Sequence, residues 1–352
     1  MTVGVARAQE PAAPSAGTAK AAPAATVVPP DNLPLARYVP GEHLALLIEH
    51  DGLDNHAEGW AKTAAFKMLN ETKLGAMLEA MTAQLADRVL ASYPNRKLNG
   101  ADVATIIKHA AMRGVVVGGG ILPNAGNKGH TVIVFRGATA KDVRGPFSRM
   151  VGSFMGASKP QLGKKGSRTV VVVPAAEKGG QSWSWWSEGN DLVIESGEAA
   201  LAGDVLDGKL KSAVDHPIRQ ALTQGDGAFQ PVGRILLDVQ ALPGTGLAGS
   251  PLASLKGVGL DRIEWRYGVD NDAITSVVKL AAPSPRKGLM ALFDQPTFDT
   301  SKVPPLPEGL GSFVAISLDA DKAVEPSFEL APRRRQGDHR STGRDTQEQV
   351  AR

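Results

Sequence analysis

The chain of 352 residues contains no cysteine. Without thiols, the sequence excludes disulfide bonds, thiolate metal sites and cysteine nucleophiles. The absence fits an exported protein as well as a cytosolic one, so it does not indicate a compartment.

Long hydrophobic runs are also absent, although 42% of the residues are hydrophobic. No run reaches the roughly 18 apolar residues that a membrane-spanning helix requires. The sequence therefore predicts no transmembrane segment, and its length allows one large globular domain or two ordinary ones.

Net charge is confined to one end of the chain. The whole chain has a formal charge of +3, and residues 332–352 alone contain six arginines against three acidic residues. The rest of the chain is therefore neutral overall. Because the folded part carries no net positive charge, we predict that it does not bind nucleic acid.

The most informative stretch is a strand, a polar turn and two helices near the N-terminus. Leu44–Ile48 is short and apolar, which predicts a buried strand. In the turn that follows, Asn55 and Glu58 have the spacing of a capping box. Two apolar stripes at helical spacing come next, and both are predicted to face a common core. They are Ala57, Trp60, Ala61, Ala64, Ala65 and Met68, then Leu74, Met77, Leu78, Met81, Leu85 and Val89.

The rest of the chain alternates strand and helix patterns. Short links between strands, such as the one between Trp183–Ser187 and Asp191–Glu195, favour antiparallel pairs. A strand, a turn and a helix recur from Leu44, Val132, Ile235 and Phe313. The predicted class is α+β, with a mostly antiparallel or mixed sheet built from recurring strand-turn-helix units and helices packed on the sheet. Further strands are predicted at Gly114–Leu122, Thr131–Arg136, Thr169–Val173, Arg234–Val239, Asp261–Gly268, Ala273–Leu280 and Ser312–Leu318, and helices at Val103–Ala111, Val143–Phe154, Glu198–Leu206, Pro217–Thr223 and Leu289–Phe293.

The two ends of the chain have the composition of disordered segments. Residues 1–34 are rich in Ala and Pro, and Ala6-Arg7-Ala8-Gln9 has the pattern of a signal-peptide cleavage site. We expect a signal-peptide remnant with a linker, or an ordinary disordered N-terminus. Residues 35–330 are predicted to form the globular domain, with a sub-boundary near 225–230. Residues 331–352 form an Arg-rich tail, either a basic tail for an anionic partner or the product of a frameshift or premature end.

The turn after the first strand holds the densest set of metal-ligand residues. His50, Asp51, Asp54 and His56 offer imidazole and carboxylate groups, which suit zinc or another divalent ion. The same residues are also typical of a turn that leads into a capped helix. Both interpretations stay open.

Three tryptophans lie on one predicted strand. Trp183 and Trp185 share a face and Trp186 takes the other, because side chains alternate along a strand. The pair predicts either a platform for sugar rings or apolar ligands, or large anchors of the core.

No sequence motif indicates catalysis. Gly118-Gly119-Gly120 and Gly163–Ser167 lack the spacing of phosphate-binding loops and are interpreted as loops. Glu42, Glu49 and Asp238 lie near strand ends and are interpreted as solvated carboxylates rather than acid–base groups. We therefore predict no catalytic residue and no cofactor.

Several short segments resemble a known family. They include Asp51-Gly52-Leu53, the run Gly189–Ser196, Asp215–Arg219 and Leu237–Leu242. Over residues 38–325 the chain resembles exported bacterial proteins of a domain of unknown function, common in planctomycete-type genomes. The resemblance implies a periplasmic or extracellular location and supplies no catalytic residues.

Together these observations predict a non-enzymatic, extracytoplasmic binding, scaffold or envelope-associated protein with an envelope component or a protein as its partner. The alternative is a metal-dependent hydrolase that uses the turn from His50 to His56.

Overall fold

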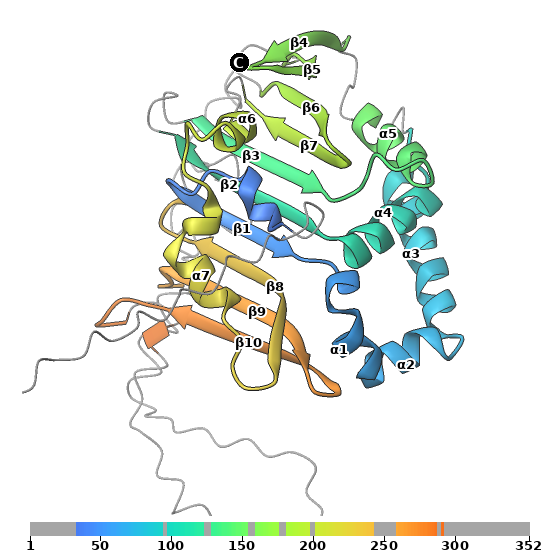
Figure 1. Ribbon diagram of the computed structural model, residues 1–352, viewed down its shortest axis with the longest axis vertical. Helices are drawn as coiled ribbons and strands as arrows, with labels where there is room; N and C mark the ends of the chain where they lie inside the picture. The colour runs from blue at the N-terminus through green and yellow to red at the C-terminus, as the bar shows by residue number, and fades with distance from the viewer. Residues whose placement is uncertain are drawn as a thin grey trace, which may run out of the picture. The chain divides into compact units, whose positions relative to one another are not determined.

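Figure 1 shows the computed structural model of the chain, which describes residues 33–93, 97–122, 128–153, 159–175, 181–197, 201–242, 258–286 and 290–291. The fold is that of the unit Pro34–Arg352, over those of its residues that the structure describes. Most of the predicted N-terminal linker, the strand predicted at Ser312–Leu318 and the Arg-rich tail lie outside the described residues.

Ten strands form one open sheet in which every neighbouring pair is antiparallel, which confirms the predicted α+β class. The order across the sheet is β10-β9-β8-β1-β2-β3-β7-β6-β5-β4, so the first strand of the chain lies in the interior of the sheet. The strands are β1 (Leu44–His50), β2 (Val115–Leu122), β3 (Lys128–Phe135), β4 (Gln161–Lys165), β5 (Arg168–Val173), β6 (Trp183–Glu188), β7 (Asp191–Ser196), β8 (Phe229–Asp238), β9 (Arg262–Asp270) and β10 (Ala273–Ala281).

Helices lie on both faces and along one end of this sheet (Figure 1). Within the described residues the α-helices are α1 (Ala57–Lys62), α2 (Ala64–Asn70), α3 (Leu74–Ala91), α4 (Gly100–Arg113), α5 (Arg144–Ser153), α6 (Leu201–Leu206) and α7 (Pro217–Thr223). Short 3-10 helices occur at η2 (Leu35–Tyr38), η3 (Leu53–His56) and η5 (Ala213–Asp215). None of the helices described is long and apolar enough to cross a lipid bilayer.

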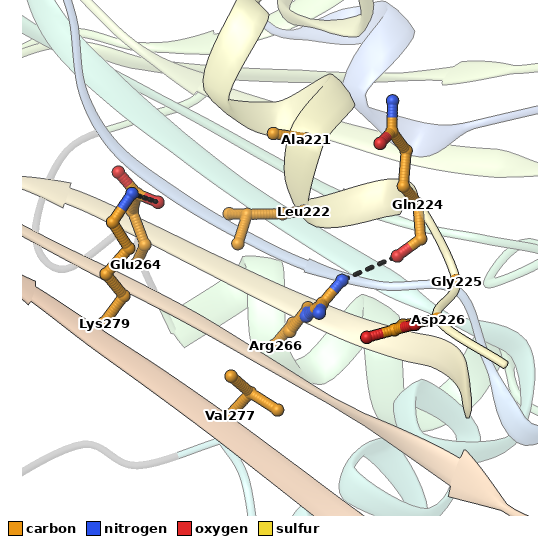
Figure 2. Close-up of a pocket in the computed structure, with 9 residues that line it drawn as sticks. All are labelled: Ala221, Leu222, Gln224, Gly225, Asp226, Glu264, Arg266, Val277 and Lys279. Carbon is orange, nitrogen blue, oxygen red and sulfur yellow. Dashed lines mark hydrogen bonds and ion pairs between the residues drawn. The ribbon is translucent and has the colours of Figure 1, made fainter. Parts of the chain in front are cut away.

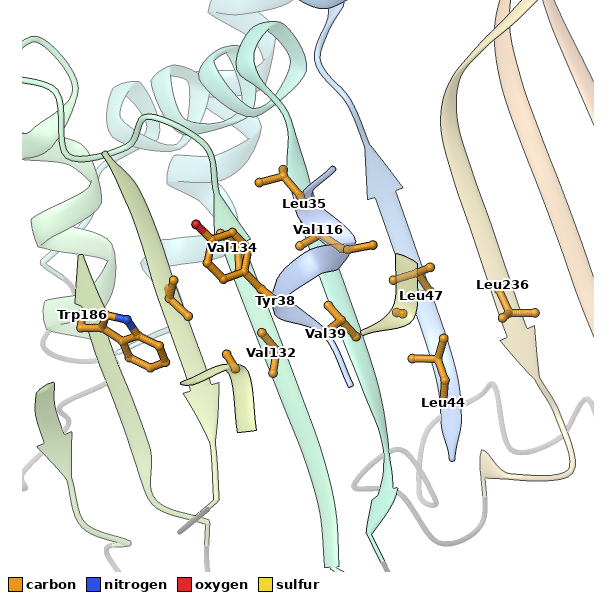
Figure 3. Packing of buried hydrophobic residues seen from close by; sticks show 14 of the residues in the cluster. Leu35, Tyr38, Val39, Leu44, Leu47, Val116, Val132, Val134, Trp186 and Leu236 are labelled. Carbon is orange, nitrogen blue, oxygen red and sulfur yellow. The ribbon is translucent and has the colours of Figure 1, made fainter. Parts of the chain in front are cut away.

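Buried hydrophobic residues form three clusters in the described part of the chain; two lie on opposite faces of the sheet, because side chains alternate along the strands, and the third contains Leu237, Val239 and Leu242. On one face, η2 packs on the middle strands, with Tyr38 and Val39 among Val116, Val132 and other buried residues (Figure 3). On the opposite face, Phe147 of α5 and Ile106 of α4 pack against Trp185 of β6. Burial of these apolar side chains is the main force that holds the helices on the sheet.

The three consecutive glycines lie inside β2, which confirms the strand predicted at Gly114–Leu122, and the interpretation of these glycines as a loop is wrong. A Cβ atom on Gly118 would lie 2.2 Å from Val39 Cγ1, and one on Gly120 would lie 2.1 Å from the carbonyl oxygen of His43. Glycine within a strand often marks such a close approach. Here the missing side chains let the segment before β1 pack directly on the sheet. Gly163 likewise lies in β4 rather than in a loop.

The first predicted helix is interrupted at Thr63. This residue has extended backbone angles (φ −73°, ψ 148°), and its Oγ1 accepts a hydrogen bond from the Phe66 N–H at 3.0 Å, which caps α2. The capping box predicted at Asn55 is wrong, because Asn55 donates its side-chain amide to the Asp51 carbonyl instead. A capping box does occur further on, between Asn99 and Asp102 at the start of α4.

The prediction that both apolar stripes face a core is also wrong. No residue of α1, α2 or α3 is buried. A helical period shows that apolar side chains share one face, but it does not show what that face contacts.

Candidate functional site

His50 ends β1 and lies between α4 and β9. Its Nε2 lies 2.8 Å from the Ala111 carbonyl oxygen, and its Nδ1 lies 3.1 Å from the hydroxyl oxygen of Tyr267. Because a carbonyl oxygen only accepts, Nε2 holds the proton and Nδ1 accepts from the tyrosine. Burial lowers the pKa of His50 and favours this neutral form.

The two acidic candidates of the same turn are paired with different cations. Asp51 Oδ2 accepts a hydrogen bond from Arg234 Nη1 at 2.9 Å and lies 3.8 Å from His56 Nε2. Burial by itself raises the pKa of Asp51, but His56 and Arg234 outweigh it and lower this pKa. Asp54 lies 3.6 Å from Arg113 Nη1 at the end of α4.

Of the four predicted metal ligands, the structure brings Asp51 and His56 together, whereas His50 and Asp54 contact other protein groups. Across the described ranges, no group of three or more His, Asp or Glu side chains is arranged to hold a metal ion. The turn itself depends on Gly52, whose φ is +91° and whose Cβ position would lie 2.5 Å from the Arg113 carbonyl carbon. Because Gly52 has no side chain, the turn after β1 packs directly against the backbone at the end of α4.

The tryptophans of β6 divide between the two faces of the sheet as the alternation predicts. Trp185 is 8% exposed and belongs to the core that contains Phe147, while Trp183 packs against that core and is partly buried. Trp186 lies in the opposite core and donates its Nε1–H to Glu188 Oε2 at 2.9 Å. The burial of Trp185 favours the interpretation of this pair as core anchors.

Glu49 is not a solvated carboxylate, contrary to the prediction, because its side chain is fully buried. Arg219 of α7 donates from Nε to Oε2 at 2.8 Å and from Nη2 to Oε1 at 2.9 Å. Oε1 also accepts from the Ala36 N–H at 3.1 Å, and Arg234 lies opposite Glu49 on β8 with its Nη1 at 3.6 Å. Through these hydrogen bonds, Glu49 links η2 and α7 to β1 in the interior of the sheet.

Most of the exposed large hydrophobic side chains of the described helices lie on the outward face of α3. Met77, Met81 and Leu85 follow one another at intervals of four residues and are 50%, 55% and 64% exposed. Leu78 and Val89 widen this stripe and are 42% and 55% exposed. We call these five residues the α3 stripe.

The opposite side of α3 contacts α4 through polar and small residues. Glu79 accepts a hydrogen bond from Lys108 Nζ at 3.0 Å, and Asp87 accepts one from the Gly100 N–H at 2.8 Å. The helices approach closely at Gly100, where a Cβ would lie 1.9 Å from the Ala83 carbonyl oxygen. Because Glu79, Ala83 and Asp87 are each two residues after a stripe residue, they lie about 200° around the helix from it. The α3 stripe therefore faces away from α4.

Basic residues lie at both ends of the stripe. Lys73 precedes the first turn of α3 and Arg88 lies beside Leu85, and both side chains are exposed. Neither side chain makes a hydrogen bond or an ion pair with another residue that the structure describes. The exposed surface of α3 is thus apolar in the middle and positive at its ends.

No protein-family model, curated protein or solved structure matches the chain. Sequence reasoning identified the residues of the α3 stripe but assigned them to the core, and it missed Arg219 and Arg234 entirely. Nothing in their local sequence pattern indicates a buried ion pair with Glu49, because the three residues are far apart along the chain.

Proposed function

We propose that this protein is a non-enzymatic, extracytoplasmic binding or scaffold protein, and that its α3 stripe binds an amphipathic helix of a partner protein. The observation that carries the proposal is an 18-residue helix whose apolar face points away from the helix it packs against. Exposed apolar patches of this kind are typical of protein-binding surfaces.

The chemistry of the stripe suits a helical partner. A helix that presents apolar residues at intervals of three and four can pack its side chains between Met77, Met81 and Leu85. Methionine side chains are flexible and adapt to different apolar surfaces. Burying the stripe in such a contact would remove from water the apolar surface that the protein's own fold leaves exposed.

The charges at the two ends specify the partner further. Lys73 and Arg88 are separated by 15 residues, or about 22 Å along a helix. Their positive charges favour a partner helix with acidic residues at a similar separation and an apolar centre. Both basic side chains lie on an exposed surface, so we expect them to contribute more to orientation and association rate than to affinity.

An anionic membrane would also offer negative charge and apolar groups, but the helix lacks the features that favour it. Helices that lie in a membrane surface usually combine a Lys/Arg-rich polar face with Trp or Phe on the apolar face. The polar face of α3 contacts α4 through Glu79 and Asp87, and the α3 stripe contains only Met, Leu and Val. The residues favour a protein partner.

Binding to a defined helical peptide tests this proposal. The probe is a fluorescent amphipathic peptide of about 22 residues with a Leu/Met face and Glu residues that match Lys73 and Arg88 in spacing. We expect saturable binding by the full chain, loss of binding in Met81→Lys/Leu85→Lys, and normal binding in Ala80→Lys, which adds a charge to α3 outside the stripe.

Two further arms distinguish the alternatives. The unmodified protein should bind more weakly to a peptide with Lys in place of Glu. It should not bind to vesicles that contain phosphatidylglycerol. Binding only to the vesicles would replace the protein partner with a membrane. Binding to neither probe, or equal binding by the stripe variant and the control, would overturn the proposal.

The extracytoplasmic location rests on the family resemblance and the pattern at Ala6–Gln9. Cell fractionation with N-terminal sequencing of the native protein tests it. A mature chain that starts near Gln9 in the envelope fraction supports export, and a cytosolic chain that starts at Met1 contradicts it. No observation in the described structure favours the metal-dependent hydrolase.

A further inference from the structure

A small pocket lies at the edge of the sheet, between α7 and the β9–β10 hairpin (Figure 2). Its volume is about 380 Å³, which lies within the range of small-molecule sites in proteins. Leu222 and Val277 supply apolar lining from opposite sides. This pocket is formed by elements other than α3 and is thus independent of the α3 stripe.

The floor of the pocket follows directly from strand pairing. Glu264 of β9 is opposite Lys279 of β10, and Arg266 is opposite Val277, so these four side chains share one face of the hairpin. Glu264 and Lys279 lie side by side, with 3.6 Å between Nζ and Oε2 (Figure 2). Glu264 is only 6% exposed and also accepts from Arg262 Nε at 2.6 Å.

Arg266 is held in place at the wall of the pocket. Its Nη1 donates to the Gln224 carbonyl oxygen at 2.6 Å (Figure 2), and its guanidinium carbon lies 5.1 Å from the centre of the Phe229 ring. These contacts use one N–H and one face of the guanidinium. The structure describes no acceptor for its other N–H groups, which are free to bind a ligand.

Asp226 provides an opposite charge at the same pocket. Its carboxylate makes no hydrogen bond or ion pair with any described residue, although Arg266 lines the same cavity. Lys279 is 69% exposed, and its only described partner is the already bonded Glu264. The pocket thus combines a fixed cation, an unpartnered carboxylate, an exposed ammonium group and an apolar surface.

We propose that this pocket binds a small zwitterion with an apolar side chain, of the class of free α-amino acids. The ligand carboxylate binds Arg266 and Lys279, the ligand ammonium group binds Asp226, and the side chain packs against Leu222 and Val277. A ligand with a single charge would leave one of the protein's charged groups without a partner in the pocket. A neutral apolar ligand would leave both groups unpaired.

Calorimetric titration of the full chain with three related probes tests this assignment. L-leucine has both charges, N-acetyl-L-leucine lacks the ammonium group, and L-leucinamide lacks the carboxylate. We expect leucine to bind at least about tenfold more tightly than either analogue, because each analogue loses one charge-assisted contact.

Variants of the lining residues assign each end of the ligand. Asp226→Asn should weaken leucine binding and leave N-acetyl-L-leucine binding unchanged, whereas Lys279→Met should weaken leucine and leave L-leucinamide unchanged. Asp215→Asn and Lys211→Met are the matched controls, since both are exposed residues that do not line the pocket. All four variants alter exposed side chains, so their melting temperatures should equal that of the unmodified protein.

The proposal fails if none of the three probes binds at about 10 mM, or if leucine binding is the same in the lining variants and the controls. Equal affinity for leucine and one analogue would also overturn it, because the pocket would then recognise a single charge.

Discussion

Arg219 on α7 donates two hydrogen bonds to Glu49 on β1, at 2.8 Å and 2.9 Å, although the residues are 170 positions apart. Both side chains are almost completely removed from water. A buried carboxylate that loses its cation leaves an uncompensated charge, which is far more costly than losing an exposed ion pair.

The first prediction concerns this pair. We expect Arg219→Met to lower the free energy of unfolding by about 3–5 kcal/mol, because Glu49 would keep only Arg234, at 3.6 Å, and the Ala36 N–H. The double variant Glu49→Leu/Arg219→Met should be more stable than Arg219→Met. It buries no unpaired charge, because Glu49 is gone and Arg234 still forms its ion pair with Asp51. Urea denaturation of both variants measures the difference, and a double variant no more stable than Arg219→Met would contradict this account.

The second prediction compares two leucines with different surroundings. Leu47 of β1 is 1% exposed and Leu85 of α3 is 64% exposed. Leu47→Ala should lower the free energy of unfolding by about 2–5 kcal/mol, because it removes buried methyl groups and leaves a cavity. Leu85→Ala should change it by less than about 0.5 kcal/mol. A large loss for Leu85→Ala would show that α3 packs against a further part of the chain.

The third prediction concerns pH. His130 on β3 is 5% exposed, and burial lowers its pKa to about 4, with a smaller opposing effect of the Gly120 backbone. Between pH 6.5 and about 4 the unfolded chain therefore binds a proton that the folded chain does not. The stabilising effect of neutral His130 is complete above pH 6.5 and declines as the pH falls, by at most about 3 kcal/mol.

The variant His130→Leu isolates this effect. Its free energy of unfolding should vary less between pH 4 and 6.5 than that of the unmodified protein, while His50 still titrates in both. Chemical denaturation at several pH values measures the slope. An unchanged slope would contradict the assignment of this pH dependence to His130.

The fourth prediction tests the glycines of β2. Gly118→Ala should destabilise the fold, because its Cβ would lie 2.2 Å from a buried methyl group of Val39. We expect a loss of about 1–3 kcal/mol, typical of overpacking. Gly163→Ala in β4 is the control. The nearest atom to its new Cβ would be a methyl carbon of Val172, at 3.2 Å, and Val172 is half-buried near the edge of the sheet. Equal stability of the two variants would contradict the close approach of Val39 to β2.

Local patterns predicted the strands well. The alternating and apolar runs from Leu44 to Ile48 and from Ala273 to Leu280 match β1 and β10, and the short Glu-Gly-Asn link correctly predicted the β6–β7 hairpin. Strand periodicity and turn chemistry are properties of neighbouring residues, so they can be read from the sequence. The division of Trp185 and Trp186 between two faces follows for the same reason.

Tertiary placement could not be predicted in this way. The stripe of Met77, Met81 and Leu85 has the spacing of a core helix, yet α3 contacts α4 through Glu79 and Asp87. Glu49 has the position of a solvated strand end, yet Arg219 and Arg234 surround it. Both outcomes depend on elements that are distant in sequence, and periodicity within one element does not identify them.

The central claim is that the α3 stripe is a contact surface, and spin labelling measures this most directly. The chain has no cysteine, so Leu85→Cys and Ala80→Cys each provide one labelling site. A nitroxide at position 85 should be mobile in the free protein and immobilised when the acidic-flanked helical peptide is added, while a nitroxide at position 80 should stay mobile. If both labels respond equally, or if the label at position 85 is already immobile in the free protein, the α3 stripe is not the binding surface.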